Sequence, residues 1–463
     1  MSTELKDLHL ADLYERAASA GVRGYRKLPR EELIETLDRK RSGIVDDEAD
    51  TDELAVIEKP EPDEAEKAKP KRAEKAKPRR AEKAKPERAR KTKLERAEKA
   101  DDDRVEPATD EDEESSDEQV TTDVSGVLEM TRQRYGFLRL SGLEPEPGDV
   151  YVSAAQVRRC ELRSGDEVSG PAREPKRGER HRALVHVDQV NGHEPSSVER
   201  IDFDGLPPVI PERRIDLGDD ASVLVRAVDL LAPLAFGQRV LVRAASRSGR
   251  TTLLRSLARV VAGNETASVV VMLIDESPEE ATAWRENVPE AEFAIATAEM
   301  AAGEQVRVAE LALERARRLT ESGRDAVLIC DSLSRLALAA GEPTEVKRLF
   351  GSGRNLAGGG SLTVVATILA DALDTGEAER AVVTTESSLV VLDPDLAAAG
   401  VTPAVRAAEC RVSNEEQIRE PEELEAARKL RALLADLKHS DAAALLRERI
   451  EATASNAELL RSL

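Results

Sequence analysis

The stretch that decides the fold is Ala244-Ala245-Ser246-Arg247-Ser248-Gly249-Arg250-Thr251-Thr252. It lies between an apolar, strand-like run (Arg239–Val242) and a segment with helical periodicity (Leu253–Val261). A phosphate-binding loop has the pattern G-x-x-x-x-G-K-[ST] in this strand–loop–helix setting, where backbone N–H groups and the helix N-terminus hold the phosphates. Here Ala244 replaces the first glycine and Arg250 replaces the lysine. The stretch alone therefore fits an ordinary strand-to-helix turn as well as a nucleotide site.

Two acidic residues favour the nucleotide interpretation. Glu276 closely follows the strand-like run Val269–Ile274, and Asp331 directly follows Ala326–Cys330. The carboxyl ends of parallel strands face the crevice where such sheets bind ligands. We therefore predict that Thr251 and Asp331 hold Mg²⁺ and that Glu276 orients and deprotonates an attacking water.

Residues 205–420 as a whole alternate between strand-like and helical runs. Further strand-like runs are Leu362–Ile368 and Leu389–Leu392, and Glu304–Thr320 is the clearest helical stretch. Hydrophobic strands alternating with helices predict an α/β fold, in which helices cover both faces of a mainly parallel sheet. Residues 421–463 are rich in Leu and Ala and have a helical pattern.

Residues 123–197 have a different pattern. Short alternating runs are broken by Gly, Pro and Asp, which predicts a small all-β barrel. Tyr135, Phe137 and Tyr151 gather here although aromatic residues make up only 2% of the chain. Aromatic rings on the surface of a barrel strand stack on single-stranded bases. The alternative is that Phe137 or Tyr151 belongs to the core.

The sequence of residues 1–122 predicts little compact structure. Residues 1–40 have the pattern of a small helical unit. Residues 41–122 contain octapeptide repeats such as AEKAKPKR and AEKAKPRR, followed by an acidic run, and they have no apolar face to bury. We expect a disordered charged linker. Its basic half could bind RNA weakly or pair with the acidic half.

Composition limits the classes of function. The net charge of −22 disfavours general attraction to nucleic acid or to an acidic membrane, so any RNA site must be a local patch. The apolar runs are far shorter than the ~20 residues that span a bilayer, and residues 1–10 contain no signal-peptide core. The three cysteines form no C-x-x-C pair, which argues against a disulfide framework or a zinc site. We expect a cytoplasmic protein with no membrane partner.

Many strings outside the linker resemble the Rho family of bacterial transcription termination factors. The matching strings are Gly126-Val127-Leu128-Glu129, Tyr135-Gly136-Phe137-Leu138-Arg139, Asp149-Val150-Tyr151-Val152-Ser153, Gln156-Val157-Arg158-Arg159, Gly237-Gln238-Arg239, Leu273-Ile274-Asp275-Glu276, Pro278-Glu279-Glu280, Asp331-Ser332, Arg335-Leu336 and Gly359-Gly360-Ser361-Leu362-Thr363. The resemblance implies a RecA-like P-loop ATPase domain, preceded by a cold-shock-like OB barrel and a small helical N-terminal domain.

The same resemblance implies a function and its residues. The chain would bind nascent single-stranded RNA and couple RNA-dependent ATP hydrolysis, as a helicase, to 5′→3′ translocation and transcript release from RNA polymerase. It would form a homohexamer, or a ring shared with another Rho chain. The implied catalytic residues are Glu276, Asp331 and Arg250. The implied ATP-binding residues are Gly237, Gln238, Arg247, Ser248, Gly249, Arg250, Thr251, Thr252 and Ser277. The implied RNA-binding residues are Tyr135, Phe137, Arg139, Tyr151, Arg158, Arg159, Glu179, Arg180 and His181.

The chain departs from the family pattern at several motor positions. Arg250 and Arg247 replace loop lysines, and Ser277 replaces an arginine. The segment Ala339–Val346 is shorter than the family's RNA-gripping loop. Three other departures concern residues that the family has and this chain lacks. The stretch Glu377-Ala378-Glu379 carries acids where the family has a pore lysine, Thr402 stands where the family stacks an aromatic on adenine, and Ser413 stands at or near the family's arginine finger. They leave an alternative open, namely a Rho relative that binds RNA without working as a motor.

Overall fold

The computed structural model describes residues 34, 37, 120–197, 200–217, 222–263, 267–371 and 376–463. The chain divides into two units, Met1–Ala108 and Thr109–Leu463. Ile34 and Leu37 are helical and buried, and every other described residue belongs to the second unit. Apart from these two residues and the last three of the linker, the predicted helical unit (1–40) and charged linker (41–122) lie outside the described residues.

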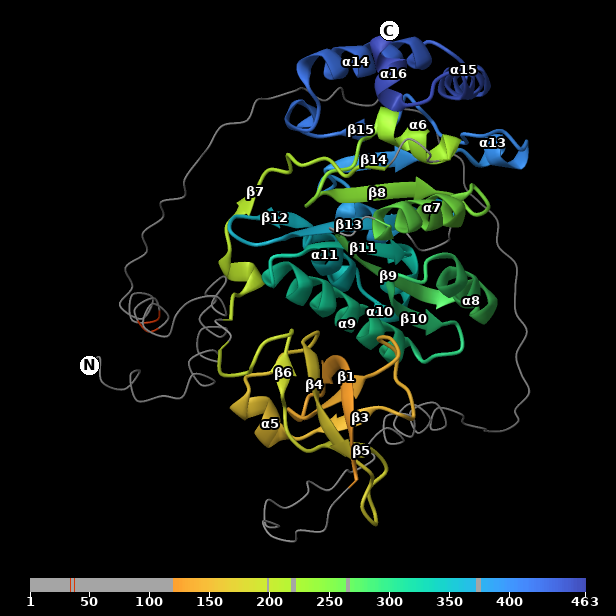
Figure 1. The fold of residues 1–463 in the computed structure, drawn as a ribbon. Coiled ribbons are helices and arrows are strands. Elements are labelled where there is room, and N and C mark those ends of the chain that lie inside the picture. Colours follow the sequence, from red (N-terminus) through yellow and green to blue (C-terminus); the bar gives the residue numbers. More distant parts are fainter. Residues whose placement is uncertain are drawn as a thin grey trace, which may run out of the picture. The chain divides into compact units, whose positions relative to one another are not determined.

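The first part of the second unit is a closed barrel (Figure 1). Strands follow the order β1-β2-β3-β5-β4, and β4 pairs back with β1, so the sheet closes on itself. Inward side chains such as Leu128, Leu138 and Val150 are fully buried. This confirms the predicted barrel. Its elements are β1 (Thr121–Met130), β2 (Gly136–Arg139), β3 (Val150–Val152), α5 (Ala154–Arg159), β4 (Glu167–Arg173), β5 (Arg182–Leu184) and β6 (Gln189–Val190).

The second part is built on a nine-stranded sheet. Its main path is β10-β9-β11-β13-β8-β14-β15; the strands from β10 to β14 are parallel, and β15 is antiparallel. This confirms the predicted mainly parallel α/β fold. The strands are β7 (Pro208–Val209), β8 (Arg239–Ala244), β9 (Ala267–Glu276), β10 (Glu292–Thr297), β11 (Asp325–Asp331), β12 (Arg354–Leu356), β13 (Ser361–Leu369), β14 (Ser388–Val391) and β15 (Arg411–Val412).

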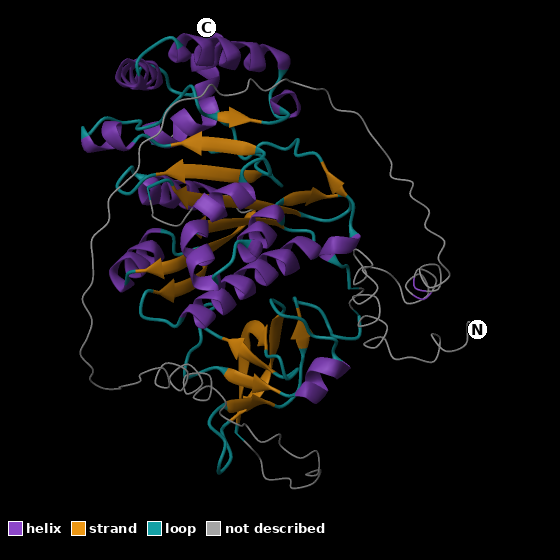
Figure 2. Ribbon diagram, turned by 180° about the vertical axis from the view of Figure 1, so that it is seen from behind, coloured by secondary structure: helices purple, strands orange, loops and turns teal. Residues whose placement is uncertain are grey.

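Helices cover both faces of this sheet (Figure 2). Along β9, Val271 and Leu273 join the core under α7 and α8, whereas Met272 and Ile274 join the core under α9 and α10. Burial on both faces explains why the parallel strands are continuous apolar runs. The helices are η2 (Phe203–Gly205), α6 (Val223–Leu231), α7 (Arg250–Ala262), α8 (Pro278–Asn287), α9 (Ala302–Glu321), α10 (Leu333–Ala340), α11 (Thr344–Gly351), α12 (Gly376–Val382), α13 (Pro394–Ala398), η3 (Glu415–Gln417), α14 (Pro421–Ala435), α15 (His439–Glu451) and α16 (Asn456–Arg461).

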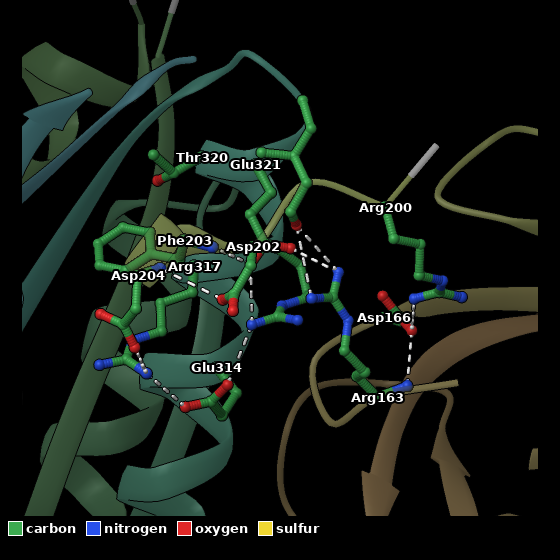
Figure 3. A network of polar contacts seen from close by, with 12 residues as sticks. Arg163, Asp166, Arg200, Asp202, Phe203, Asp204, Glu314, Arg317, Thr320 and Glu321 are labelled. Carbon is green, nitrogen blue, oxygen red and sulfur yellow. Dashed lines mark hydrogen bonds and ion pairs between the residues drawn. The ribbon is translucent and has the colours of Figure 1, made fainter. Parts of the chain in front are cut away.

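A polar network joins the barrel to the last turn of α9 (Figure 3). Glu321 accepts hydrogen bonds from Arg163 of the barrel at 2.7 Å and from the backbone N–H of Phe203 at 2.9 Å. Its third partner is Arg318, at 3.1 Å. Burial raises the pKa of Glu321, and the two arginines oppose that rise. One carboxylate therefore holds the barrel, the connecting segment and α9 together. Among the described residues, no helix is both long and apolar enough to span a membrane.

Candidate functional site

The loop between β8 and α7 has the shape of a phosphate cradle. Arg247 (φ 60°) and Gly249 (φ 87°) both adopt left-handed backbone conformations. The Ser248 hydroxyl donates to the carbonyl oxygen of Ala245 at 2.7 Å and closes the turn. A non-glycine residue with positive φ is uncommon, and such residues cluster at ligand sites. The backbone thus keeps the loop geometry although the first glycine and the lysine of the motif are replaced.

A cavity of about 480 Å³ opens at this loop, at the N-terminus of α7. Its wall carries three guanidinium groups and several hydroxyls, and no acidic side chain is among the described residues that form it. Guanidinium groups and helix N-termini both bind phosphate oxygens. The cavity therefore fits a polyphosphate. It is lined by Ser246, Arg247, Gly249, Arg250, Thr251, Thr252, Arg335 and Leu369.

Both predicted acids lie at the ends of neighbouring strands, and each has an arginine partner. Asp331 ends β11 and is only 1% exposed. Its Oδ2 lies 3.1 Å from Nε of Arg250, and its Oδ1 accepts a hydrogen bond from the Thr367 hydroxyl at 3.1 Å. Burial raises the pKa of Asp331, while Arg250 opposes the rise. Glu276 ends β9 and forms an ion pair with Arg335.

The predicted Mg²⁺ ligands do not form a free metal site. Thr251 lies in the first turn of α7, beside the cavity, as expected. The carboxylate of Asp331, however, already has the guanidinium of Arg250 at ion-pair distance, although its Oδ2 forms no hydrogen bond within the described residues. Over the described ranges, no group of three or more His, Cys, Asp or Glu side chains is placed to hold a metal ion, so most ligands of an Mg²⁺ ion here would be water and nucleotide phosphates. The guanidinium beside Asp331, rather than a shortage of acids, is what disfavours the predicted Mg²⁺.

Four of the predicted nucleotide-binding residues do not line the cavity; one of them, Ser248, is buried within the loop itself. Gly237 and Gln238 precede β8, whereas the loop follows it, so about 20 Å of extended strand separates them from the phosphate cradle. Gln238 is buried, and its side-chain oxygen accepts from the N–H of Ala235 at 2.9 Å. Ser277 caps α8, where its hydroxyl accepts from the N–H of Glu280 at 3.2 Å. These contacts stabilise turns and a helix end.

Aromatic rings form a cluster on the outside of the barrel. Phe137 and Tyr151 are direct cross-strand partners, with ring centroids 6.0 Å apart. Between ring centroids, Tyr135 lies 5.8 Å from Phe137 and His181 lies 5.0 Å from it. All four side chains are half-buried, and Phe137 and Tyr151 alternate with residues of the barrel core. This arrangement supports the stacking interpretation over the core alternative.

The remaining predicted RNA contacts divide into exposed and anchored groups. Arg158 and Arg159 are exposed at the end of α5, and Arg180 is exposed before β5. Glu179 forms a two-fold hydrogen bond with Arg173, at 2.7 and 2.8 Å, which lowers the pKa of Glu179. The pair fixes the segment that carries His181 against Phe137.

Arg139 does not present its guanidinium to the surface. Its side chain is 9% exposed and forms ion pairs with Glu129 and Asp149. Its carbon Cζ also lies 5.9 Å from the centroid of the Phe137 ring. A buried guanidinium requires such partners because desolvation of an unpaired charge is costly. Arg139 thus supports the aromatic cluster from inside, and its direct contact with RNA stays a prediction.

Sequence reasoning missed several residues of these sites. Arg335 was noted only as part of a matching string, yet it neutralises Glu276 and lines the cavity. Asp371 accepts a hydrogen bond from the loop N–H of Ser246 at 2.9 Å, which lowers the pKa of Asp371. An arginine one turn after a strand-terminal acid was the available signal for Arg335. The acids that hold Arg139 become visible only through strand register.

Residues at or near the positions where the chain departs from the family's motor pattern form local contacts. Glu379 of α12 forms an ion pair with Arg243 at 3.0 Å. Arg411, two residues before the expected finger position, is exposed and pairs with Glu386 at 2.6 Å. The N–H of Ser413 donates to the carbonyl oxygen of Ser387 at 2.7 Å. Thr402 precedes Pro403 at a bend in the chain.

This architecture defines a class of protein in which an RNA-binding barrel is joined to a RecA-like nucleotide-binding domain. Residues 124–196 match the family "Rho termination factor, RNA-binding domain". Residues 225–348 match "ATP synthase alpha/beta family, nucleotide-binding domain".

Three relatives are each described as transcription termination factor Rho. The protein of Streptomyces lividans is 38% identical over 373 residues, which cover 74% of this chain and 52% of the relative. That of Bacillus subtilis is 40% identical over 269 residues, 54% of this chain and 63% of the relative. That of Chromobacterium violaceum is 35% identical over 372 residues, which cover 73% of this chain and 87% of the relative. This chain belongs to the Rho family of transcription termination factors. It spans about half the length of the Streptomyces relative and under two thirds of the Bacillus relative.

Proposed function

We propose that this chain binds nascent single-stranded RNA on the barrel and ATP in the cavity beside α7. It couples RNA-dependent ATP hydrolysis to 5′→3′ translocation and to transcript release from RNA polymerase in the cytoplasm, as a subunit of a hexameric ring. The observation that carries this proposal is the cavity of three arginines, flanked by Glu276 and Asp331 at adjacent strand ends. Family membership supports the pairing of this site with an RNA-binding barrel.

The roles of the residues follow from charge and position. Arg247, Arg250 and Arg335 line the cavity and would neutralise phosphate oxygens. Glu276 is the general base for the attacking water, and it must first leave the guanidinium of Arg335. Because Asp331 is already paired, no step is assigned to a metal ion.

The barrel supplies the RNA site. Phe137 and Tyr151 offer aromatic rings on which bases stack. Each stacked base contributes about 1–3 kcal/mol to binding. Arg158 and Arg159 offer exposed charges for the phosphate backbone. His181 adds a ring nitrogen at the edge of the cluster, because its Nδ1 is buried without a partner among the described residues.

The test is RNA-stimulated phosphate release by the purified full-length chain, with Glu276→Ala as the matched control. We expect release by the unaltered chain to exceed that of the control by about 10²–10⁴-fold, which is the usual contribution of a general base. RNA binding by both proteins verifies that they are folded. Equal release by both, with RNA binding intact, would refute the motor and leave an RNA-binding protein without turnover.

A further inference from the structure

Arg250 and Asp331 form the most enclosed ion pair of the nucleotide site. The side chains are 13% and 1% exposed, and Nε of Arg250 lies 3.1 Å from Oδ2 of Asp331. The other carboxylate oxygen is held by Thr367. Throughout the described ranges, this is the only ion pair that Arg250 forms. The guanidinium therefore lies beside the carboxylate that binds a metal ion in the usual nucleotide-binding motif.

Arginine and lysine at this position differ in how far apart their donors lie. A lysine carries its three N–H donors on one ammonium nitrogen. A guanidinium has three nitrogens in a rigid planar fork. The ion pair of Arg250 with Asp331 runs through Nε, although neither Nε nor Oδ2 forms a hydrogen bond within the described residues, and Arg250 itself lines the cavity, so its two Nη groups remain for phosphate oxygens. A single side chain thus connects the carboxylate with the phosphates, which is the connection that a bound Mg²⁺ would otherwise make.

The charge around this pair also disfavours a metal ion. Arg247 and Arg335 line the same cavity; because Asp331 offsets the charge of Arg250 and Glu276 that of Arg335, the excess positive charge facing the phosphates is that of Arg247. Mg²⁺ requires near-octahedral oxygen ligands at 2.0–2.1 Å. A guanidinium on Asp331 removes one such ligand and adds a like charge beside the position of the ion.

We propose that the guanidinium of Arg250 stands in for Mg²⁺, so that this chain binds metal-free nucleoside triphosphate. The inference rests on the proposed function, because it assigns the ionic form of the ATP that the same cavity takes. The ligand is ATP⁴⁻, held between the Arg250 fork and the N-terminus of α7. Its affinity is independent of magnesium.

The test compares the affinity of full-length protein for ribose-labelled ATP, measured by fluorescence, in excess MgCl₂ and in excess EDTA. For the unaltered chain we expect the two dissociation constants to agree within about threefold. Arg250→Lys should bind at least about tenfold more tightly with magnesium than with EDTA, because a lysine releases Asp331. Arg247→Lys is the matched control, since it is an identical exchange in the same loop at a residue that does not pair with Asp331. Its magnesium ratio should equal that of the unaltered chain.

Each result has a distinct meaning. If the unaltered chain requires magnesium as strongly as Arg250→Lys does, then Arg250 leaves Asp331 when ATP arrives, and the inference is wrong while ATP binding stands. If labelled ATP does not bind in either buffer although RNA does, the proposed function itself is refuted. Melting temperature and RNA binding of each variant verify that a lost signal does not come from unfolding.

Discussion

The aromatic cluster of the barrel gives the sharpest test of the RNA site. Phe137 lies at its centre, since its ring contacts Tyr135, Tyr151 and His181 at centroid distances of 5.8, 6.0 and 5.0 Å. Phe137→Ala removes one stacking surface on the outer face and leaves the buried core residues in place. We therefore expect a loss of about 1–3 kcal/mol in RNA binding, which is a roughly 5- to 150-fold higher Kd.

Fluorescence anisotropy with a labelled single-stranded RNA measures this loss at several salt concentrations. Because phenylalanine carries no charge, the slope of log Kd against log salt should stay unchanged while the whole line shifts. Tyr135→Phe is the control, since it keeps the ring and removes only a hydroxyl. An unaltered Kd for Phe137→Ala, with an unchanged far-UV spectrum, would refute the stacking site. A changed salt slope would show that the substitution moved a charged group instead.

Three further predictions concern charge, stability and thiol chemistry. Arg158→Ala and Arg159→Ala should each reduce the salt slope of RNA binding by about 0.7 if each guanidinium contacts one phosphate, and an unchanged slope would place the RNA elsewhere. Arg139→Leu leaves two largely buried carboxylates unpaired, so thermal or denaturant unfolding should show that the free energy of unfolding falls by about 3–5 kcal/mol. Arg158→Leu, at an exposed arginine, is the control. A fall below about 1 kcal/mol for Arg139→Leu, similar to that of the control, would contradict the buried ion pairs of Arg139. Burial raises the pKa of Cys410 from 9.0 to about 11 and raises that of Cys330 well above 9.0. Both thiols should resist a disulfide reagent at neutral pH until the protein unfolds, and ionisation of these two thiols should lower the stability of the fold only as the pH rises above about 9, because the unfolded thiols ionise first. Rapid labelling of either thiol in the folded protein would disprove this burial.

Much of the fold could be predicted because burial leaves a direct mark on the sequence. The apolar runs that were interpreted as strands correspond to β8, β9, β11, β13 and β14, since both faces of that sheet are covered. β10 was missed because its run Glu292–Thr297 is short and partly polar. The shortest strands of the nine-stranded sheet, β7, β12 and β15, carry no recognisable pattern.

The sites were predicted less completely, for reasons of geometry. Glu276 and Asp331 were found because strand-terminal acids are visible in the sequence. Their arginine partners were not, since the pairing depends on β9 lying beside β11. Gly237 and Gln238 are close to the loop in sequence, but an extended strand carries them to the opposite edge. Arg139 resembles a surface cation until the register places Glu129 and Asp149 around it.

The arginine-lined cavity also determines which chemical probes can reach it. A guanidinium keeps its proton even at alkaline pH values that deprotonate an amine. No lysine is among the described residues that line it. Reagents that acylate amines, which report on phosphate sites built from lysine, would leave the cavity unmodified. A dicarbonyl reagent selective for guanidinium would react there, and a bound nucleotide would shield the site from it.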